Sequence, residues 1–120
     1  MTTAVLKKYK LVIFDWDGTV MDSISKIVNC IRHSALALNI EPPSDTAIKN
    51  IIGMSLELAI EVLFPEDVAH HPALVNGYKQ QYRVDTTATP VFDNVENVLS
   101  ALKAQGVILA IATGKGLAGL

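Results

Sequence analysis

The apolar positions of this sequence form two short continuous runs, separated by a long region of helical spacing. The first run covers residues 9–14 (YKLVIF) and stops at turn residues that begin with Asp15. The second run covers residues 107–112 (VILAIA) and stops at Thr113 and Gly114. A short apolar run with such boundaries is typical of a strand buried on both faces, as in a parallel sheet. The pattern therefore predicts two such strands.

A helix is predicted directly before the second strand, over residues 93–105. Asp93 and Glu96 have the spacing of a capping box at its start, and Gly106 is placed to end it. Its apolar stripe consists of Val95, Val98, Leu99 and Leu102. A helix, a short loop and a buried strand form half of an α/β unit.

Between the two runs the apolar spacing is helical throughout. A long amphipathic helix is predicted over residues 24–38, and a last one over residues 72–84. Ser44 and Ser55 are each placed to cap a shorter helix between these two, and the first of the shorter helices would end at Gly53. The residues expected to face inward are Ile24, Ile27, Val28, Ile31, Ala35 and Leu38 in the long helix, and Leu74, Tyr78 and Tyr82 in the last one.

Composition and charge narrow the class of protein. The chain has 120 residues and a mass of 12.9 kDa, and it is 50% hydrophobic and 18% charged, which excludes a disordered chain. The net charge of −2 gives no basic surface for nucleic acid, and the apolar runs are shorter than the roughly 18 residues of a membrane span. We therefore expect neither nucleic acid nor a membrane as partner. A single cysteine, Cys30, excludes an internal disulfide and favours a cytoplasmic location.

The residues that follow the first strand carry the chemistry. Positions i and i+2 of a strand share one side, so we expect Asp15 and Asp17 to face the same pocket while Trp16 points away. Gly18 allows the backbone to turn with a positive φ. Two carboxylates this close repel each other unless a divalent cation binds, and oxygen ligands suit Mg²⁺, which commonly works beside a phosphate group. One carboxylate can then attack phosphorus while the other moves protons.

A purely structural interpretation of the same residues stays open at this point. Asp-Gly is a common turn dipeptide, and a carboxylate can cap a following helix. A calcium-binding EF-hand loop fits poorly, because its glycine belongs at loop position 6 and Gly18 stands at position 4 counted from Asp15. The carboxylate pair alone therefore indicates either a metal and phosphate site or a turn.

Two segments of the chain resemble signatures of a known family. Residues 14–23 (FDWDGTVMDS) resemble the first signature of the haloacid dehalogenase-like (HAD) superfamily, in the form that its phosphatase members carry. Residues 108–115 (ILAIATGK) resemble the second signature, a buried strand that ends in Thr or Ser. The long separation of Asp15 and Thr113 leaves room for the helical cap of the subgroup that includes phosphoglycolate-phosphatase-like enzymes. The resemblance covers essentially the whole chain.

The resemblance implies an α/β fold with two parts. Residues 1–21 and 86–120 would form the opening part of a Rossmann-like parallel-sheet core with two strands, and residues 22–85 would form an inserted α-helical cap. Two parallel strands are too few for an independently stable sheet, and both would carry unpaired edges and apolar faces. We therefore expect the chain to self-associate through these strands, or to leave them loosely ordered.

The resemblance also implies roles for four residues. Asp15 would be the nucleophile that forms an aspartyl-phosphate, and Asp17 would protonate the leaving alcohol and later activate water. Both would bind Mg²⁺, Asp17 through its backbone carbonyl, while Thr113 and the amide of Gly114 would hold the transferring phosphoryl group. The implied reaction is Mg²⁺-dependent hydrolysis of a small phosphorylated metabolite, a phosphate monoester for which 2-phosphoglycolate is one candidate.

Two further features of the helical insert have alternative interpretations. In the resembled subgroup, a loop at the place of Gly53 and Ser55 lies over the active site and helps to select the substrate, but the same residues also suit a plain turn between helices. His70 and His71 would point about 100° apart on a helix, so we expect a solvated surface pair rather than a metal site.

The chain also departs from the family pattern. The third signature, which supplies a Lys, and the fourth, which supplies further Asp ligands, follow the second signature at a distance that this chain does not reach, so we expect it to be inactive or barely active alone. Lys115 is too close to Thr113 to be the third-signature Lys, and its role is left open. Two alternatives to a phosphatase remain: a non-catalytic truncated or interaction protein, and a phosphomutase-like member that transfers phosphate to a sugar hydroxyl.

Overall fold

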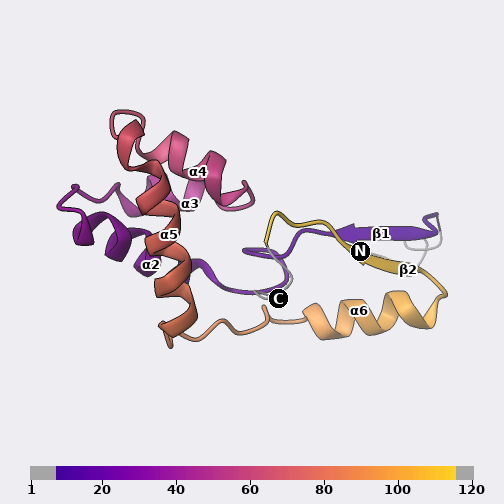
Figure 1. Ribbon diagram of the computed structural model, residues 1–120. Helices are drawn as coiled ribbons and strands as arrows, with labels where there is room; N and C mark the ends of the chain where they lie inside the picture. Colours follow the sequence, from indigo (N-terminus) through magenta and orange to yellow (C-terminus); the bar gives the residue numbers. More distant parts are fainter. Residues whose placement is uncertain (1–7, 116–120) are drawn as a thin grey trace.

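The computed structural model describes residues 8–115, and its helices and strands separate into two regions (Figure 1). The elements are β1 (Leu11–Phe14), α2 (Ile24–Ala37), α3 (Asp45–Asn50), α4 (Leu56–Leu63), the 3₁₀ helix η1 (Val68–His70), α5 (His71–Val84), α6 (Val95–Ala104) and β2 (Ile108–Ile111). The helical region comprises α2 to α5, and the strand region comprises β1, α6 and β2. These regions lie at opposite ends of a molecule that measures 53 × 26 × 25 Å. Residues 1–7 and 116–120, the two ends of the predicted core, lie outside the described residues.

Strands β1 and β2 form a parallel pair in which Leu11 lies opposite Ile108 and Phe14 lies opposite Ile111. A parallel pair needs a long crossover connection, which here consists of the helical region and α6. The predicted α/β fold, with two parallel strands and helices inserted between them in the sequence, is therefore confirmed. Among residues 8–115, no helix has both the length and the apolar character that crossing a membrane requires.

The prediction that both strands are buried on both faces is wrong. One face of the pair packs against α6, where Leu102 is buried together with Val107 of the following loop. The described part of the chain supplies no layer for the opposite face, so large apolar side chains stay accessible to solvent. On that face, Leu11, Ile13 and Ile108 are 46%, 58% and 65% exposed. Ile111, which pairs with Phe14 on the α6 face at the end of β2, is 49% exposed.

Helix α6 begins differently from the prediction and ends as predicted. Its N-cap is Asn94, which adopts the left-handed conformation (φ 66°) and makes no side-chain cap hydrogen bond. Asp93 therefore lies one residue before the cap and Glu96 at the second helical position, so the predicted capping box does not form. At the other end, Gly106 has a φ of 77°, and the next amide donates to the carbonyl of Leu102 at 3.1 Å, which completes a Schellman motif.

The helical region has a core of its own, and the apolar stripe of α2 supplies four of its eight buried residues. Helices α2 and α5 pack closely, because Gly77 lies against Ser34, whose Cβ would be 3.4 Å from a Cβ at the glycine position. Cys30 is also buried, and this burial raises the pKa of its thiol to about 11, so it acts as a small apolar residue. The core confirms the predicted stripes and consists of Ile27, Val28, Ile31, Ala35, Ile48, Ile60, Phe64 and Leu74.

The short helices of this region are capped as the sequence predicts. The Ser44 hydroxyl accepts a hydrogen bond from the amide of Ala47 at 3.1 Å, and the Ser55 hydroxyl accepts one from the amide of Leu58 at 3.4 Å. Gly53, with a φ of 106°, lies in the turn between α3 and α4. Each hydroxyl satisfies an amide that the first helical turn leaves without a partner.

The expectation of a solvated histidine pair is wrong for one of its members. His70 is exposed, but the Nε2 atom of His71 lies 2.6 Å from the carbonyl oxygen of Phe64, and its side chain is partly buried. The reason is local: η1 brings the start of α5 back to the end of α4, where the ring satisfies a helix-terminal carbonyl.

Two segments connect the regions and pair with each other. The amide of Asp22 donates to the carbonyl of Pro90 at 2.7 Å, and Met21 forms an antiparallel bridge with Val91. The chain therefore enters and leaves the helical region at one place, directly beside the loop that follows β1.

Candidate active site

The loop after β1 is a tight turn that presents two aspartates. The carbonyl of Trp16 accepts backbone hydrogen bonds from three following amides at 2.9 to 3.2 Å. Gly18 has a φ of 79°, as the sequence predicts, and its amide donates to the carbonyl of Met21 at 2.9 Å. The exposed carboxylate of Asp15 accepts a hydrogen bond from the Thr19 hydroxyl at 3.0 Å. Backbone hydrogen bonds thus fix the turn that follows Asp15, and the Thr19 hydroxyl of that turn binds its carboxylate.

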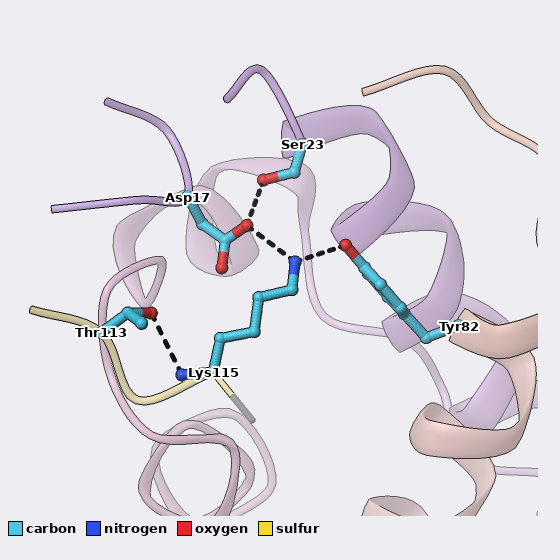
Figure 2. A network of polar contacts seen from close by, with 5 residues as sticks. All are labelled: Asp17, Ser23, Tyr82, Thr113 and Lys115. Atoms are coloured by element: carbon cyan, nitrogen blue, oxygen red, sulfur yellow. Dashed lines mark hydrogen bonds and ion pairs between the residues drawn. The ribbon is translucent and has the colours of Figure 1, made fainter. Parts of the chain in front are cut away.

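Asp17 is bound more tightly than Asp15. Its Oδ1 atom accepts a hydrogen bond from the Ser23 hydroxyl at 2.6 Å and lies 3.1 Å from the Lys115 ammonium (Figure 2). Ser23 occupies the N-cap position of α2 and is buried, but its hydroxyl makes no cap hydrogen bond and binds this carboxylate instead. The Asp17 side chain is 17% exposed, so its orientation is determined by partners from both ends of the chain.

Lys115 extends from the loop after β2 to the helical region. Its ammonium donates to the Tyr82 hydroxyl at 2.6 Å, and its amide donates to the Thr113 hydroxyl at 3.1 Å (Figure 2). Its side chain is only 14% exposed. Burial alone would lower the pKa of Lys115, but the hydrogen bonds to Tyr82 and Asp17 raise it above its ordinary value. The ammonium therefore stays charged and links the two regions.

A pocket of about 890 Å³ lies between the strand ends and the helical region. Asp15 and Asp17 line it from the loop after β1, and Thr113 and Gly114 line it from the loop after β2. Because β1 and β2 are parallel neighbours, both loops leave the same edge of the sheet. The fold thus brings all four residues, far apart in the sequence, to one pocket.

The turn between α3 and α4 closes the pocket from the helical side. Gly53 lines the pocket, whereas Ser55 lies outside the lining and caps α4. The turn approaches both strand-end loops: a Cβ at Gly114 would lie 3.3 Å from the Cα of Ser55, and a Cβ at Gly18 would lie 3.4 Å from Ile52. Glycine at position 114 permits the closer of these two approaches, whereas the distance at Gly18 is that of an ordinary van der Waals contact.

The sequence pattern did not indicate that several further residues belong to the pocket region. The sequence predicts that Tyr82 faces the helical core, but its ring also faces Lys26, whose ammonium lies 4.1 Å from the ring centroid. Tyr78 stacks on Tyr82 with 5.7 Å between ring centroids, and burial raises its pKa. A helical stripe has the same spacing whether it covers a core or lines a pocket, so the pattern could not separate the two uses. Ser23 is the last residue of the first motif, residues 14–23, and this position was the available signal for its contact with Asp17.

The two carboxylates suit an open magnesium site better than a metal site whose ligands are all protein side chains. In the described range, 8–115, no three side chains of the His, Cys, Asp and Glu type lie close enough to hold a metal together. Asp15 and Asp17 nevertheless both line a roomy pocket. Mg²⁺ is commonly bound by one or two carboxylates and keeps several waters or phosphate oxygens as its other ligands. This donor set therefore suits Mg²⁺ beside a phosphate group.

Relatives of the chain are known both by sequence and by structure. A 5'-nucleotidase from Pseudomonas aeruginosa is 29% identical over 109 residues, which make up 90% of this chain and 49% of that protein. A phosphoglycolate phosphatase from Xylella fastidiosa is 29% identical over 109 residues, 88% of this chain and 47% of that protein. The crystal structure of a predicted phosphatase from Clostridium acetobutylicum matches with a TM-score of 0.82 at 25% identity, over 92% of this chain and 52% of that chain. The chain spans about half the length of the curated relatives it matches.

A family model also matches the sequence. The model of the haloacid dehalogenase-like hydrolases matches residues 12–118, which include β1 from its second residue, β2, the helical region and both strand-end loops. This confirms the family that the two sequence signatures indicate. The chain therefore belongs to the haloacid dehalogenase-like hydrolase family.

Proposed function

We propose that this protein is the part of a Mg²⁺-dependent phosphatase that carries the nucleophile and the proton-transfer group for hydrolysis of small phosphate monoesters. The observation that carries the proposal is the convergence of Asp15 and Asp17 with Thr113 and Gly114 in one pocket at the strand ends. Membership of the hydrolase family supports it, as do relatives named phosphoglycolate phosphatase and 5'-nucleotidase. The relatives are about twice as long as this chain, so the proposal concerns the activity of the whole protein.

The proposed reaction has two steps at phosphorus. A carboxylate oxygen of Asp15 attacks the phosphorus atom, the bond from phosphorus to the alcohol oxygen breaks, and Asp17 gives its proton to the leaving oxygen. Water then attacks the aspartyl-phosphate, Asp17 accepts the proton, and the bond between phosphorus and Asp15 breaks to release phosphate. The Thr113 hydroxyl and the Gly114 amide would hold the phosphoryl oxygens. Mg²⁺ bound by Asp15 and Asp17 would supply positive charge against the carboxylates and the phosphoryl group.

The hydrogen bonds of Asp17 suit a proton-transfer group. Its two hydrogen bonds among the described residues, from Ser23 and Lys115, both involve Oδ1. The Oδ2 atom is thus left to carry the transferred proton toward the pocket. Asp15 accepts a single hydrogen bond from Thr19 and is exposed, as a nucleophile that must reach phosphorus needs to be.

The division of the chain supports a separate role for the helical region. We assign residues 1–21 and 86–120 to a partial α/β core and residues 22–85 to a cap that covers the pocket and selects the substrate. Gly53 lines the pocket, and Ser55 supports the same turn. A small monoester such as 2-phosphoglycolate would lie between this turn and the aspartates.

The test is Mg²⁺-dependent phosphate release by a longer polypeptide that carries this sequence. We expect Asp15→Asn to abolish turnover, because an amide cannot act as the nucleophile, while its matched control Asp93→Asn, at an exposed position outside the pocket, keeps wild-type turnover. Undiminished turnover in Asp15→Asn would refute the proposal.

Product analysis of the same reaction separates hydrolysis from transfer. With a sugar phosphate and its acceptor present, a phosphatase releases inorganic phosphate, whereas a phosphomutase-like member gives the isomeric sugar phosphate. We expect free phosphate as the product. The isolated 120-residue chain is expected to show little or no turnover in this assay.

A further inference from the structure

The charged residues that line the pocket separate into two groups. Asp15, Asp17 and Lys115 line it from the strand-end loops. On the helical side, Lys26, Lys79 and Arg83 line it from α2 and α5, and Glu57 of α4 is the one carboxylate among the lining residues there. If the phosphoryl group lies against Asp15 and Thr113, as the proposed function requires, the rest of the substrate extends toward these cations. The charges on the helical side of the pocket therefore influence which alcohol group the substrate can carry.

Lys26 differs from the other lysines of the pocket in its partners. Lys79 lies 4.0 Å from the Glu57 carboxylate, and Lys115 is paired with Asp17. Among the described residues, no carboxylate lies within ion-pair distance of Lys26. Its charge lowers the pKa of Asp85, but more weakly than the hydrogen bonds that this carboxylate accepts from Thr87.

The Tyr82 ring positions the Lys26 ammonium. The ammonium lies 4.1 Å from the ring centroid, within the range of a favourable cation–π contact, and the side chain is partly buried. On the same tyrosine, the hydroxyl accepts a hydrogen bond from Lys115 (Figure 2). Two ammonium groups therefore converge on Tyr82, and Asp17 balances only one of them. A partly desolvated ammonium without a counterion favours an anionic ligand.

We propose that Lys26 is a specificity-determining residue that binds a second anionic group, a carboxylate or a phosphate, on the alcohol part of the substrate. This inference rests on the proposed function, because it takes the phosphoryl group to occupy the aspartate end of the pocket. The substrate class is then a phosphate monoester that carries a further negative charge close to the ester. Esters of neutral alcohols would occupy the phosphoryl end alone.

The test compares two probes of similar size by isothermal titration calorimetry on the 120-residue chain with Mg²⁺. The probes are 2-phosphoglycolate and ethyl phosphate, which differ by the carboxylate. We expect the wild type to bind 2-phosphoglycolate about tenfold more tightly, the low end for a charge-assisted hydrogen bond at a partly exposed site. Lys26→Met should remove this preference and leave ethyl phosphate binding almost unchanged, whereas Lys26→Arg should retain the preference.

The matched control is Lys49→Met, a lysine of α3 in the same helical region that lies outside the pocket lining. It should keep the tenfold preference. Equal binding of the two probes by the wild type, or an unchanged preference in Lys26→Met, would overturn the inference and leave the proposed function standing. Failure of the wild type to bind either probe, with its helical circular dichroism intact, would also overturn the inference, whereas the proposed function is decided by the turnover test on the longer polypeptide. If Lys26→Met does not fold, the same two probes are compared on Lys26→Gln, which should also lose the preference of the wild type for 2-phosphoglycolate.

Discussion

The helical region and the strand region bury their apolar side chains to very different extents. In the helical region, Ile48, Ile60 and Leu74 are fully shielded from solvent by neighbouring helices. In the strand region, the buried core consists of Leu102 and Val107. A helix forms its backbone hydrogen bonds internally, and only its apolar stripe has to pack against a neighbour. A strand of a parallel sheet needs a hydrogen-bonded neighbour at each edge and a packed layer on each face. The same apolar content therefore produces a complete core in one region and exposed apolar faces in the other.

This difference matters for the pocket, because the proposed catalytic residues belong to the less protected region. Asp15 and Thr113 follow β1 and β2, while the helical region contributes Lys26 and Tyr82 from the opposite wall. Lys115 crosses between the two with its hydrogen bond to Tyr82. The geometry of the site thus depends on contacts between a well-packed region and a sparsely packed one.

The largest effect is expected from shortening a buried side chain in the helical core, and it tests the difference in burial between the two regions. Leu74→Ala removes a fully buried side chain from the helical core, so we expect a loss of about 3 kcal/mol in the free energy of unfolding. The matched change Leu11→Ala, at a strand position that is 46% exposed, should cost less than about 0.5 kcal/mol. Urea unfolding followed by circular dichroism measures both. Equal losses for the two variants would contradict the difference in packing.

The burial pattern shows how far the sequence alone could predict this fold. The stripe of α2 and the two strands follow from local periodicity, and these predictions are confirmed. The exposure of Ile13 does not follow from periodicity, because an apolar run does not show which layers cover a strand. It agrees instead with the expectation, drawn from the resemblance, of two strands with unpaired edges and apolar faces. The late start of α6 depends on the left-handed conformation of Asn94, which a capping-box spacing does not reveal.

The sequence predicted that the residues of the two motifs lie in one pocket, but it did not predict which other side chains contact them. Asp17 and Thr113 follow predicted strands, so a parallel sheet brings them to one edge. The contact of Asp17 with Lys115 spans 98 positions, and that of Lys115 with Tyr82 spans 33. Such contacts depend on how the helical region lies against the strand ends, which no local pattern contains. The roles of these residues in catalysis stay predictions.

The second expected effect concerns the coupling of the two regions. Trp16 is the single tryptophan and reports on the strand region by fluorescence, while circular dichroism reports mainly on the helices. Lys115→Met leaves the carboxylate of Asp17 without its cation and the Tyr82 hydroxyl without its donor, so we expect a loss of about 2 kcal/mol in the free energy of unfolding. The fluorescence transition should shift to lower urea by more than the helical transition.

A double-mutant cycle identifies the source of that loss. Tyr82→Phe should cost about 1 kcal/mol, and the double variant with Lys115→Met should cost less than the two single changes together, because they share one hydrogen bond. The control Lys49→Met, outside this network, should add independently to Tyr82→Phe. Strict additivity of Lys115→Met and Tyr82→Phe would show that the two regions are not joined through this contact.

The smallest effect on stability is expected at the exposed face of the sheet, where the effect on association is the informative one. Ile13 and Ile108 are 58% and 65% exposed, so changing both to Thr should alter the free energy of unfolding by less than about 0.5 kcal/mol. An uncovered apolar strand face with open edges nevertheless favours contact with a second copy. Sedimentation velocity over a concentration series should therefore show self-association of the wild type that the double variant reduces.

Leu36 provides the matched control for this experiment, because it is 61% exposed but belongs to a helix. Its backbone hydrogen bonds are satisfied within α2, so it offers an apolar side chain without an open edge. Leu36→Thr should leave the association unchanged. If it reduced association as much as the strand variant did, general surface hydrophobicity would explain the effect and the strands would have no special part in it. If only the strand variant reduces association, the unpaired strand edge explains why exposed apolar residues promote self-association in the strand region, whereas an equally exposed one in the helical region does not.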